Sequence, residues 1–295
     1  MTTNIAELTG RGVVSVTGPE AEPFLQGLVT ADVEGLAPGA ARYGALLTPQ
    51  GKILFDFLAV RTPDGFLIDV PARLAADFAK RLRFYRLRAK VEIADRSGDL
   101  RVLAAWGDGP VDLPGFGFED PRLPALGRRT IVTAAERDAV LAASDPGSHA
   151  DEASWHRHRI ALGVPEGGTD FAYGDAFPHD ADMDDLAGVD FGKGCYVGQE
   201  VVSRMKHRGT ARRRVVAARS ADASPLPPTG SEIVAAGKPV GQIGSTDGGR
   251  GLALVRTDRV AAALAAGASL RAGDVDVVLE LPAYVKFGWP APAED

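Results

Sequence analysis

Hydrophobic and polar positions alternate in short blocks over the first third of the chain, and turn residues separate the blocks. Blocks rich in β-branched or aromatic residues predict strands at residues 11–17, 43–48, 53–61 and 66–70. Pro49, Gln50 and Gly51 lie between the second and third blocks, which predicts a hairpin. Apolar side chains then recur every three or four residues from Leu74 to Tyr85, which predicts a helix over residues 71 to about 87.

The pattern in the remainder of the sequence predicts a less regular region followed by a small β domain. Glycine and proline are dense between Gly107 and Arg129, where we expect a loop, and residues 167–194 lack periodicity. Thr133 and Glu136 have the spacing of a capping box, which predicts a helix start. Beyond Arg212, short strands are expected at residues 232–236, 240–245, 252–256 and 275–281. Such spacing predicts a barrel or sandwich, interrupted by a helix at 260–266.

Composition narrows the classes of function. The chain has 295 residues with 33 Lys+Arg, 39 Asp+Glu and a net charge of −6, which argues against a general nucleic-acid binder and against DNA binding. It holds one cysteine, Cys195, so an intrachain disulfide and a multi-thiolate zinc site are excluded. The N-terminal residues lack a secretory pattern, and no apolar run is long enough to predict a membrane span. These features predict a cytoplasmic protein.

A basic cluster follows the most distinctive segment of the chain. Its members are Arg204, Lys206, His207, Arg208, Arg212, Arg213 and Arg214. The cluster is either a solvated surface or a face for a polyanion such as phosphate, a polycarboxylate tail, tRNA or an acidic partner.

The distinctive segment itself runs from Gly188 to Arg204 and surrounds Cys195 with glycines. A nearby ammonium, here that of Lys193, favours the thiolate form that attacks or binds metal. An inert cysteine would more often lie in an apolar strand. The residues therefore predict a reactive or metal-ligating thiol in a glycine-rich loop, and they leave open which of the two it is.

Lys193-Gly194-Cys195-Tyr196-Val197-Gly198-Gln199-Glu200 resembles the signature of the YgfZ family, folate-binding proteins similar to the aminomethyltransferase (T-protein) of the glycine cleavage system. Further segments that match the family are residues 24–30 with Asp32, residues 48–56, residues 189–191, and Trp155, Arg159, Gly163 and Pro165.

The resemblance implies a fold and a ligand. The implied fold is α+β: a T-protein-like folate-binding body of intertwined α/β subdomains over residues 1–210 and a C-terminal β-barrel over residues 211–295. Tetrahydrofolate is the implied ligand, and the residues expected to bind it are Asp56, Tyr43, Arg159, Gln199, Glu200 and Arg204. Cys195 and Lys193 are the implied functional pair.

The implied function is assembly or repair of 4Fe–4S proteins, with an indirect effect on tRNA modification. Because a cluster needs about four ligands and the chain has one thiolate, Cys195 would hold a transient cluster only jointly with a partner or a small thiol. Expected partners are folate and iron–sulfur assembly or client proteins, with the chain itself a monomer that does not act on membranes.

Two departures from T-protein argue against glycine cleavage. The acidic pair of T-protein corresponds here to Phe55-Asp56, and the Glu with which T-protein holds the pterin corresponds to Ala161. A folate-dependent one-carbon transferase that uses Asp56 as general acid or base is the alternative function. An RNA-binding module that uses the basic cluster is the third possibility considered.

Overall fold

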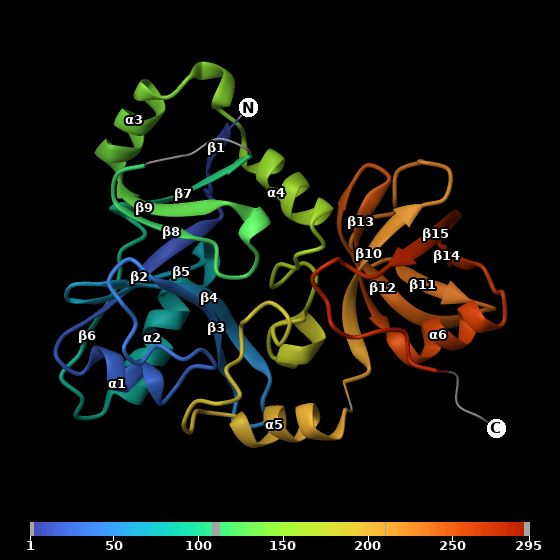
Figure 1. The fold of residues 1–295 in the computed structure, drawn as a ribbon, viewed down its shortest axis with the longest axis horizontal. Coiled ribbons are helices and arrows are strands. Elements are labelled where there is room, and N and C mark those ends of the chain that lie inside the picture. Colours follow the sequence, from blue (N-terminus) through green and yellow to red (C-terminus); the bar gives the residue numbers. More distant parts are fainter. Residues whose placement is uncertain (1–2, 108–112, 210, 292–295) are drawn as a thin grey trace. The chain divides into compact units, whose positions relative to one another are not determined.

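The computed structural model describes residues 3–107, 113–209 and 211–291 (Figure 1). The chain divides into two compact units. The first comprises residues 1–49, 54–156 and 186–199, and the second comprises residues 50–53, 157–185 and 200–295. Each unit therefore combines stretches that are far apart in the sequence.

A five-stranded sheet in the order β3-β4-β5-β2-β6 forms one layer of the first unit. Its strands are β2 (Arg11–Thr17), β3 (Ala41–Leu47), β4 (Ile53–Thr62), β5 (Gly65–Pro71) and β6 (Glu92–Asp95). Strand β2 pairs antiparallel with both β5 and β6, and β4 pairs antiparallel with β5. All four strands that the alternating blocks predict lie in this sheet.

Two helices accompany this sheet, α1 (Ala21–Gln26) and α2 (Ala75–Arg86), and α2 follows a short 3-10 turn, η1 (Ala72–Leu74). The buried face of α2 includes Phe78, whose ring centroid lies 5.2 Å from that of Phe55 and 5.4 Å from that of Phe57. Apolar spacing of three and four residues places these side chains on one face, so the predicted helix is confirmed.

A four-stranded sheet in the order β1-β7-β9-β8 completes the first unit. Its strands are β1 (Thr3–Glu7), β7 (Leu100–Gly107), β8 (Phe116–Glu119) and β9 (Arg128–Thr133). The loop expected over residues 107–129 is wrong in part, because β8 pairs antiparallel with β9. Residues 108–112 of that loop lie outside the described residues. An edge strand needs only one partner, so it forms despite the surrounding glycines and prolines.

Helix α3 (Ala134–Ala143) begins at the predicted capping box. The Glu136 backbone N–H donates to Thr133 Oγ1 at 3.2 Å, and the Thr133 N–H donates to Glu136 Oε2 at 2.7 Å. After the 3-10 turn η3 (Pro146–Ser148), the chain forms helix α4 (Glu152–Ala161).

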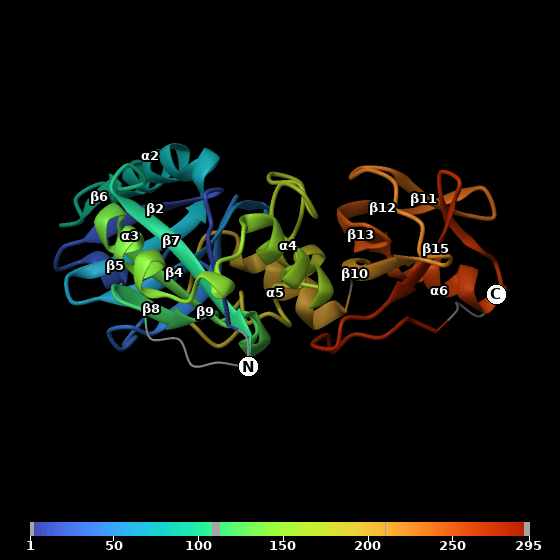
Figure 2. The same cartoon turned by 90° about the horizontal axis from the view of Figure 1, so that it is seen from above.

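The C-terminal part of the second unit is a closed barrel in the order β10-β13-β12-β11-β14-β15, drawn in orange and red in Figures 1 and 2. Its elements are β10 (Arg213–Ser220), β11 (Glu232–Ala235), β12 (Lys238–Asp247), β13 (Arg250–Arg256), α6 (Thr257–Ala265), β14 (Leu270–Ala272) and β15 (Val275–Glu280). Ile233, Ile243 and Val260 lie among the buried apolar residues of this unit. The expected fold class, a mixed α/β body with a C-terminal barrel, is confirmed.

Between α4 and the barrel the chain contains a 3-10 turn, η4 (Pro178–Ala181), and helix α5 (Gln199–Arg208). The domain boundary expected between residues 210 and 211 stays a prediction, and residue 210 lies outside the described residues. Among the described helices, none combines the length and the apolar character that a membrane crossing requires.

Candidate functional site

The glycine-rich loop is anchored through Lys193. The Lys193 ammonium donates hydrogen bonds to the Val29 carbonyl at 2.9 Å, to Gln26 Oε1 at 3.2 Å and to the Ala31 carbonyl. An ammonium has three N–H donors. These three oxygens therefore use its donor capacity, and the geometry gives Lys193 the task of holding the loop against the end of α1.

The backbone of the loop is held in the same way. Asp190 Oδ1 accepts from the N–H groups of Gly192 at 2.7 Å and Lys193 at 2.9 Å. The Asp190 N–H donates to the Thr30 carbonyl, and Thr30 Oγ1 donates to the Gly188 carbonyl at 2.6 Å. The sequence motif and the segment around residue 30 thus form one hydrogen-bonded structure.

Burial changes the proton affinity of Lys193. It lowers the pKa of the ammonium to about 8, although Asp32, Asp190 and Glu34 favour the charged form. The ammonium lies 5.6 Å from the ring centroid of Tyr196, and burial raises the pKa of that phenol to about 12. The side chains of Lys193 and Tyr196 are therefore partly shielded from water.

Cys195, between Gly194 and Tyr196 in the chain, is exposed. At the neighbouring Gly194, no atom other than those of the two adjacent residues lies within 4 Å of the place where a side chain would start. Among the residues that the structure describes, no three His, Cys, Asp or Glu side chains are grouped to hold a metal ion. The chain therefore presents a single thiol, and this thiol is accessible to a ligand or a partner.

Tyr43 and Asp56, both expected at a folate site, do lie together. They are on β3 and β4, and the Tyr43 hydroxyl donates to Asp56 Oδ2 at 3.1 Å. Both side chains are buried. Burial, and then the Asp56 carboxylate, hold the pKa of the Tyr43 phenol well above its usual value. The pair offers one carboxylate and one phenol inside the first unit.

A chain of buried ions lies next to this pair and was not predicted. The Arg122 guanidinium lies 5.7 Å from the Tyr43 ring centroid and donates to both oxygens of Asp120, at 2.9 and 2.7 Å. Burial by itself would raise the pKa of Asp120, but the Arg122 and Arg129 guanidinium groups together outweigh it and lower the pKa to about 2. Arg129 continues the chain by donating to Asp120 Oδ2 at 3.1 Å.

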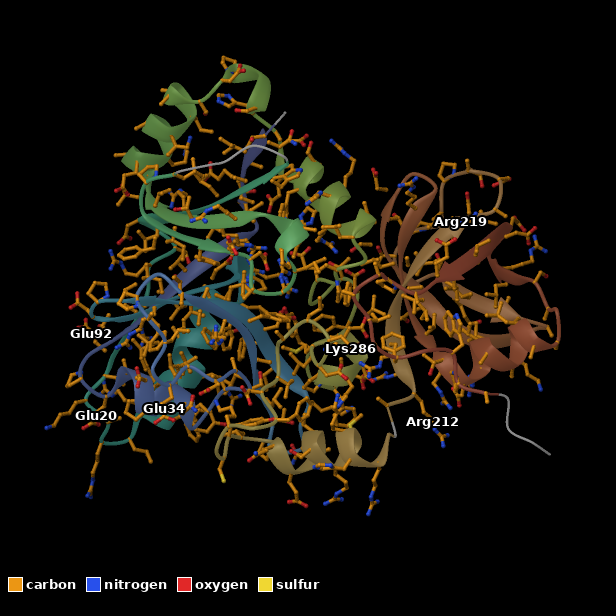
Figure 3. All side chains as sticks on the ribbon, viewed as in Figure 1. Glu20, Glu34, Glu92, Arg212, Arg219 and Lys286 are labelled. Carbon is orange, nitrogen blue, oxygen red and sulfur yellow. The ribbon has the colours of Figure 1, made fainter. Side chains whose placement is uncertain are left out.

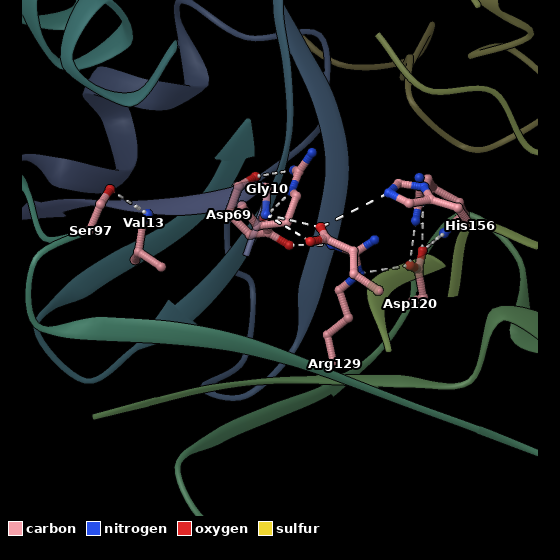
Figure 4. A network of polar contacts seen from close by, with 10 residues as sticks. Gly10, Val13, Asp69, Ser97, Asp120, Arg129 and His156 are labelled. Carbon is pink, nitrogen blue, oxygen red and sulfur yellow. Dashed lines mark hydrogen bonds and ion pairs between the residues drawn. The ribbon is translucent and has the colours of Figure 1, made fainter. Parts of the chain in front are cut away.

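The chain of ions passes through Asp69, which is fully buried (Figure 4), and ends at Arg11. Asp69 accepts from Arg129 Nη1 at 2.5 Å and from Arg11 Nε at 2.5 Å. Asp69 interrupts the apolar run 66–70, and a charge inside an apolar strand is the one signal in the sequence that marks this network. The ions join β2 and β5 of one sheet to β9 of the other.

Arg159, expected to bind folate, is buried in the second unit and bonded within it. Its guanidinium donates to the Val164 carbonyl at 3.1 Å, to Asp170 Oδ2 at 3.0 Å and to Ser245 Oγ at 2.7 Å. Glu166 lies 3.1 Å away as a further ion partner. Arg159 therefore ties residues 164–170 to the barrel strand β12.

The remaining expected folate residues lie at the start of α5. The backbone N–H of Gln199 donates to the Tyr196 carbonyl at 3.3 Å. Glu200 and Arg204 are exposed and form an ion pair with each other one helical turn apart. Gln199 belongs to the first unit, whereas Glu200, Arg204 and Arg159 belong to the second.

Three members of the basic cluster have buried or half-buried acidic partners: Arg213, Arg214 and Lys206, whose ammonium lies 3.8 Å from Asp184 Oδ2. Arg213 donates to Asp180 at 2.7 Å, and Arg214 donates to the Asp184 carboxylate at 2.5 and 3.0 Å. Arg212 is 69 % exposed and projects from the chain (Figure 3). The cluster is thus partly a set of internal ion pairs of the second unit.

Comparison with known proteins defines the class and then the family. Residues 2–111 match the model of the GCVT N-terminal domain, and residues 212–287 match that of the CAF17 C-terminal beta-barrel domain. The glycine cleavage system aminomethyltransferase T from Bartonella henselae superposes with a TM-score of 0.76 over 97 % of this chain and 87 % of that one, at 17 % identity. The fold is therefore that of an aminomethyltransferase.

The curated relatives are more specific. The iron–sulfur cluster assembly factor IBA57 of Homo sapiens, named mitochondrial, is 32 % identical over 96 % of this chain and 84 % of its own length. The IBA57 homologue of Mycosarcoma maydis is 36 % identical over 73 % of this chain. The chain belongs to the IBA57 family. It spans 57 % of the Mycosarcoma maydis relative and 52 % of the one from Neurospora crassa.

These comparisons refine one expectation and overturn another. The expected resemblance holds for the GCVT body and the CAF17 barrel, but the relatives carry the name IBA57 and not YgfZ. The prediction of a cytoplasmic protein is wrong, because the relatives are named mitochondrial. Lack of a secretory pattern and a single thiol separate secreted from intracellular proteins, and they do not distinguish the cytoplasm from the mitochondrion.

Proposed function

We propose that this chain supports the assembly or repair of 4Fe–4S proteins and that Cys195 is the residue through which it acts. The observation that carries the proposal is the exposed thiol on a loop anchored by three hydrogen bonds from Lys193. The names of the IBA57 relatives supply the class of cargo. An effect on tRNA modification would be indirect, through an iron–sulfur enzyme.

The cluster is cargo in this proposal. Thiolates are the usual protein ligands of such clusters, which take about four of them. Because the chain has one cysteine, the other ligands come from a partner protein or a small thiol. The role of the loop is to hold the thiol in place. Asp190 is hydrogen-bonded to the Thr30 carbonyl and to the backbone of Gly192 and Lys193, so the segment that leads to Cys195 is held by its backbone.

The experiment replaces Cys195 in cells that lack the endogenous homologue. Wild type is expected to restore the activity of a 4Fe–4S enzyme, whereas Cys195→Ser at equal protein level is expected to restore little of it. Ser203→Ala, on α5, is the matched control and should behave as wild type. Equal rescue by Cys195→Ser would contradict the proposal.

Tetrahydrofolate binding is the finer part of the proposal. The buried Tyr43–Asp56 pair fits a pterin, because a carboxylate and a hydroxyl match the donors and acceptors of its ring edge. Arg159 does not fit, since Val164, Asp170 and Ser245 already take its donors. We therefore place the expected contact at Asp56 and Tyr43 and leave Arg159 a structural role.

Calorimetric titration with tetrahydrofolate tests this placement. Wild type should bind, Asp56→Asn should bind at least about tenfold more weakly, and Arg204→Ala, whose exposed side chain is paired with Glu200, should lose less affinity than Asp56→Asn. No heat of binding with wild-type protein at high concentration would contradict folate binding. A loss with Arg204→Ala as large as that with Asp56→Asn would move the site away from the Tyr43–Asp56 pair.

A one-carbon transferase is the second candidate, and the Tyr43–Asp56 pair is the observation that favours it. A buried carboxylate bonded to a phenol is a plausible general acid or base beside a bound pterin. Turnover of an aminomethyl donor to methylene-tetrahydrofolate by wild type, lost with Asp56→Asn, would establish it over the assembly role.

A further inference from the structure

The C-terminal end of α2 carries an unusual concentration of positive charge. Residues 80–90 contain Lys80, Arg81, Arg83, Arg86, Arg88 and Lys90 and no acidic residue, in a chain with an excess of Asp and Glu. None of the six forms an ion pair with any residue that the structure describes. Arg83 donates to the Ile93 carbonyl at 2.8 Å, and the Lys90 backbone N–H donates to Glu20 at 2.9 Å. The six side chains are exposed, and none of them is paired with a carboxylate among the described residues.

Two large apolar side chains stand among these cations. Phe84 is 73 % exposed and Leu87 is 88 % exposed, more than any other large hydrophobic residue that the structure describes. The core-facing side of the same helix is already filled by Phe78 and Leu82, which are fully buried. Phe84 and Leu87 thus add nothing to the core, and they remain available for an outside contact.

The backbone at Leu87 is strained. Leu87 ends α2 with a φ of 45°, in the left-handed region that favours glycine. A residue with a side chain costs about 1–2 kcal/mol in such a conformation. Strain of this kind collects at functional positions, and here it keeps an apolar side chain at the surface.

Helix electrostatics explain only part of the pattern. Cations in the last turn, such as Arg86, interact favourably with the helix dipole. The dipole does not explain Lys80 and Arg81 one turn earlier, and it gives no reason for exposed Phe84 and Leu87. A contact with another molecule accounts for all four.

Three kinds of molecule carry the complementary negative charge. Single-stranded RNA binds over successive aromatic platforms, whereas Phe84 is the only fully exposed ring in this segment as described. A membrane-bound helix inserts a continuous apolar face, but the apolar face of α2 packs in the core. Arginine and phenylalanine together are typical of the centre of protein interfaces, and four of the six cations are arginines.

We propose that Arg81, Phe84, Arg86, Leu87 and Arg88, the α2 surface, form a docking site for a partner protein whose own surface is acidic around an apolar pocket. Phe84 and Leu87 are the anchors that enter the pocket, and the arginines select the acidic rim. The surface lies wholly in the first unit (Figure 2). It is separate from Cys195, and the proposal does not rest on the iron–sulfur role.

Site-specific photo-crosslinking in cells tests the docking site in the full-length chain. Benzoylphenylalanine replaces Phe84 in one variant and the exposed Leu264 of α6 in the control variant. We expect one discrete protein adduct from position 84 and none from position 264. The crosslinked peptide, identified by mass spectrometry, should carry net negative charge beside an apolar residue.

Charge reversal then shows whether the crosslink depends on the arginines of the α2 surface or only on the two proteins being close together. Arg81→Glu with Arg86→Glu should reduce the adduct at least about tenfold at equal expression and with unchanged thermal unfolding, while Cys195→Ser should leave it intact. An adduct removed by nuclease, an adduct with lipid, a neutral or basic peptide, an adduct that survives charge reversal, or no adduct above that of position 264 would each overturn the proposal.

Discussion

The first unit holds two charged regions that are built in opposite ways. In the buried chain from Arg11 to Arg122, each carboxylate lies between guanidinium groups, and no member faces solvent freely. In the loop around Cys195, the ammonium is bonded to oxygens while the thiol next to it is exposed. Both regions use charge for support, but only the loop leaves a thiol exposed. A charged region in which every group is paired therefore indicates a structural role, whereas an exposed side chain beside a paired group marks a candidate functional site.

Breaking the buried ion network should have the largest effect on stability. Asp69→Asn leaves Arg11 and Arg129 without their shared carboxylate in a dry site, and we expect a loss of about 3–5 kcal/mol of unfolding free energy. Urea unfolding followed by the fluorescence of Trp106 and Trp155, which lie in the first unit, measures it. The control is Asp99→Asn, which removes the exposed pair with Arg96 and should change little. Similar losses in both variants would contradict this account of the network.

The pH dependence of the unfolding free energy at acid pH tests the ionised state of Asp120 in the buried ion network. The pKa of Asp120 in the folded protein is about 2, below its ordinary value of 3.8, so its stabilisation is present above about pH 4 and is lost as the pH falls toward 2. A shift of this size corresponds to about 2 kcal/mol. Asp120→Asn should lose at least that much at pH 7, and its difference from wild type should shrink on acidification. A difference that does not change between pH 5 and pH 2.5 would show that Asp120 is not ionised in the native protein.

Removing the anchor of the loop should cost less. Lys193→Met leaves the Val29 and Ala31 carbonyls without this donor, and we expect a loss of about 1–2 kcal/mol and faster proteolysis of the loop. Because burial lowers the pKa of Lys193 to about 8, the unfolded chain binds the extra proton between about pH 8 and pH 10. Wild-type stability should therefore rise with pH in that range relative to the variant. Unchanged proteolysis in Lys193→Met would mean that the loop is held by Asp190 alone.

The smallest effect is expected at the surface of α5. Glu200→Gln removes the exposed ion pair with Arg204, one turn apart, and should change the unfolding free energy by less than about 0.5 kcal/mol. Thermal unfolding at low and high salt measures it, and the variant should lose the small salt dependence of wild type. A loss above about 1 kcal/mol would show that Glu200 has a further role in the fold.

Local pattern was sufficient for several elements. The helix predicted over residues 71–87 is observed at Ala75–Arg86, because its apolar residues repeat with the helical period. The capping box at Thr133 is observed because both partners are three residues apart. Strand β8 was missed because an edge strand rich in glycine and proline depends on its pairing with β9, which no local pattern records.

For the candidate site, the sequence by itself determined the candidate residues: one cysteine, a lysine two positions before it, and the glycines around them. Its resemblance to the YgfZ family indicated the GCVT-like body and the C-terminal barrel, whereas the relatives carry the name IBA57. Only the tertiary structure decided what those residues contact. It directed the Lys193 ammonium to Gln26, Val29 and Ala31, placed Arg159 in the second unit, and joined Asp69 to Arg129 from 60 positions away. The physical reason is that side-chain identity is local, whereas burial and ion pairing depend on which distant strands pack together.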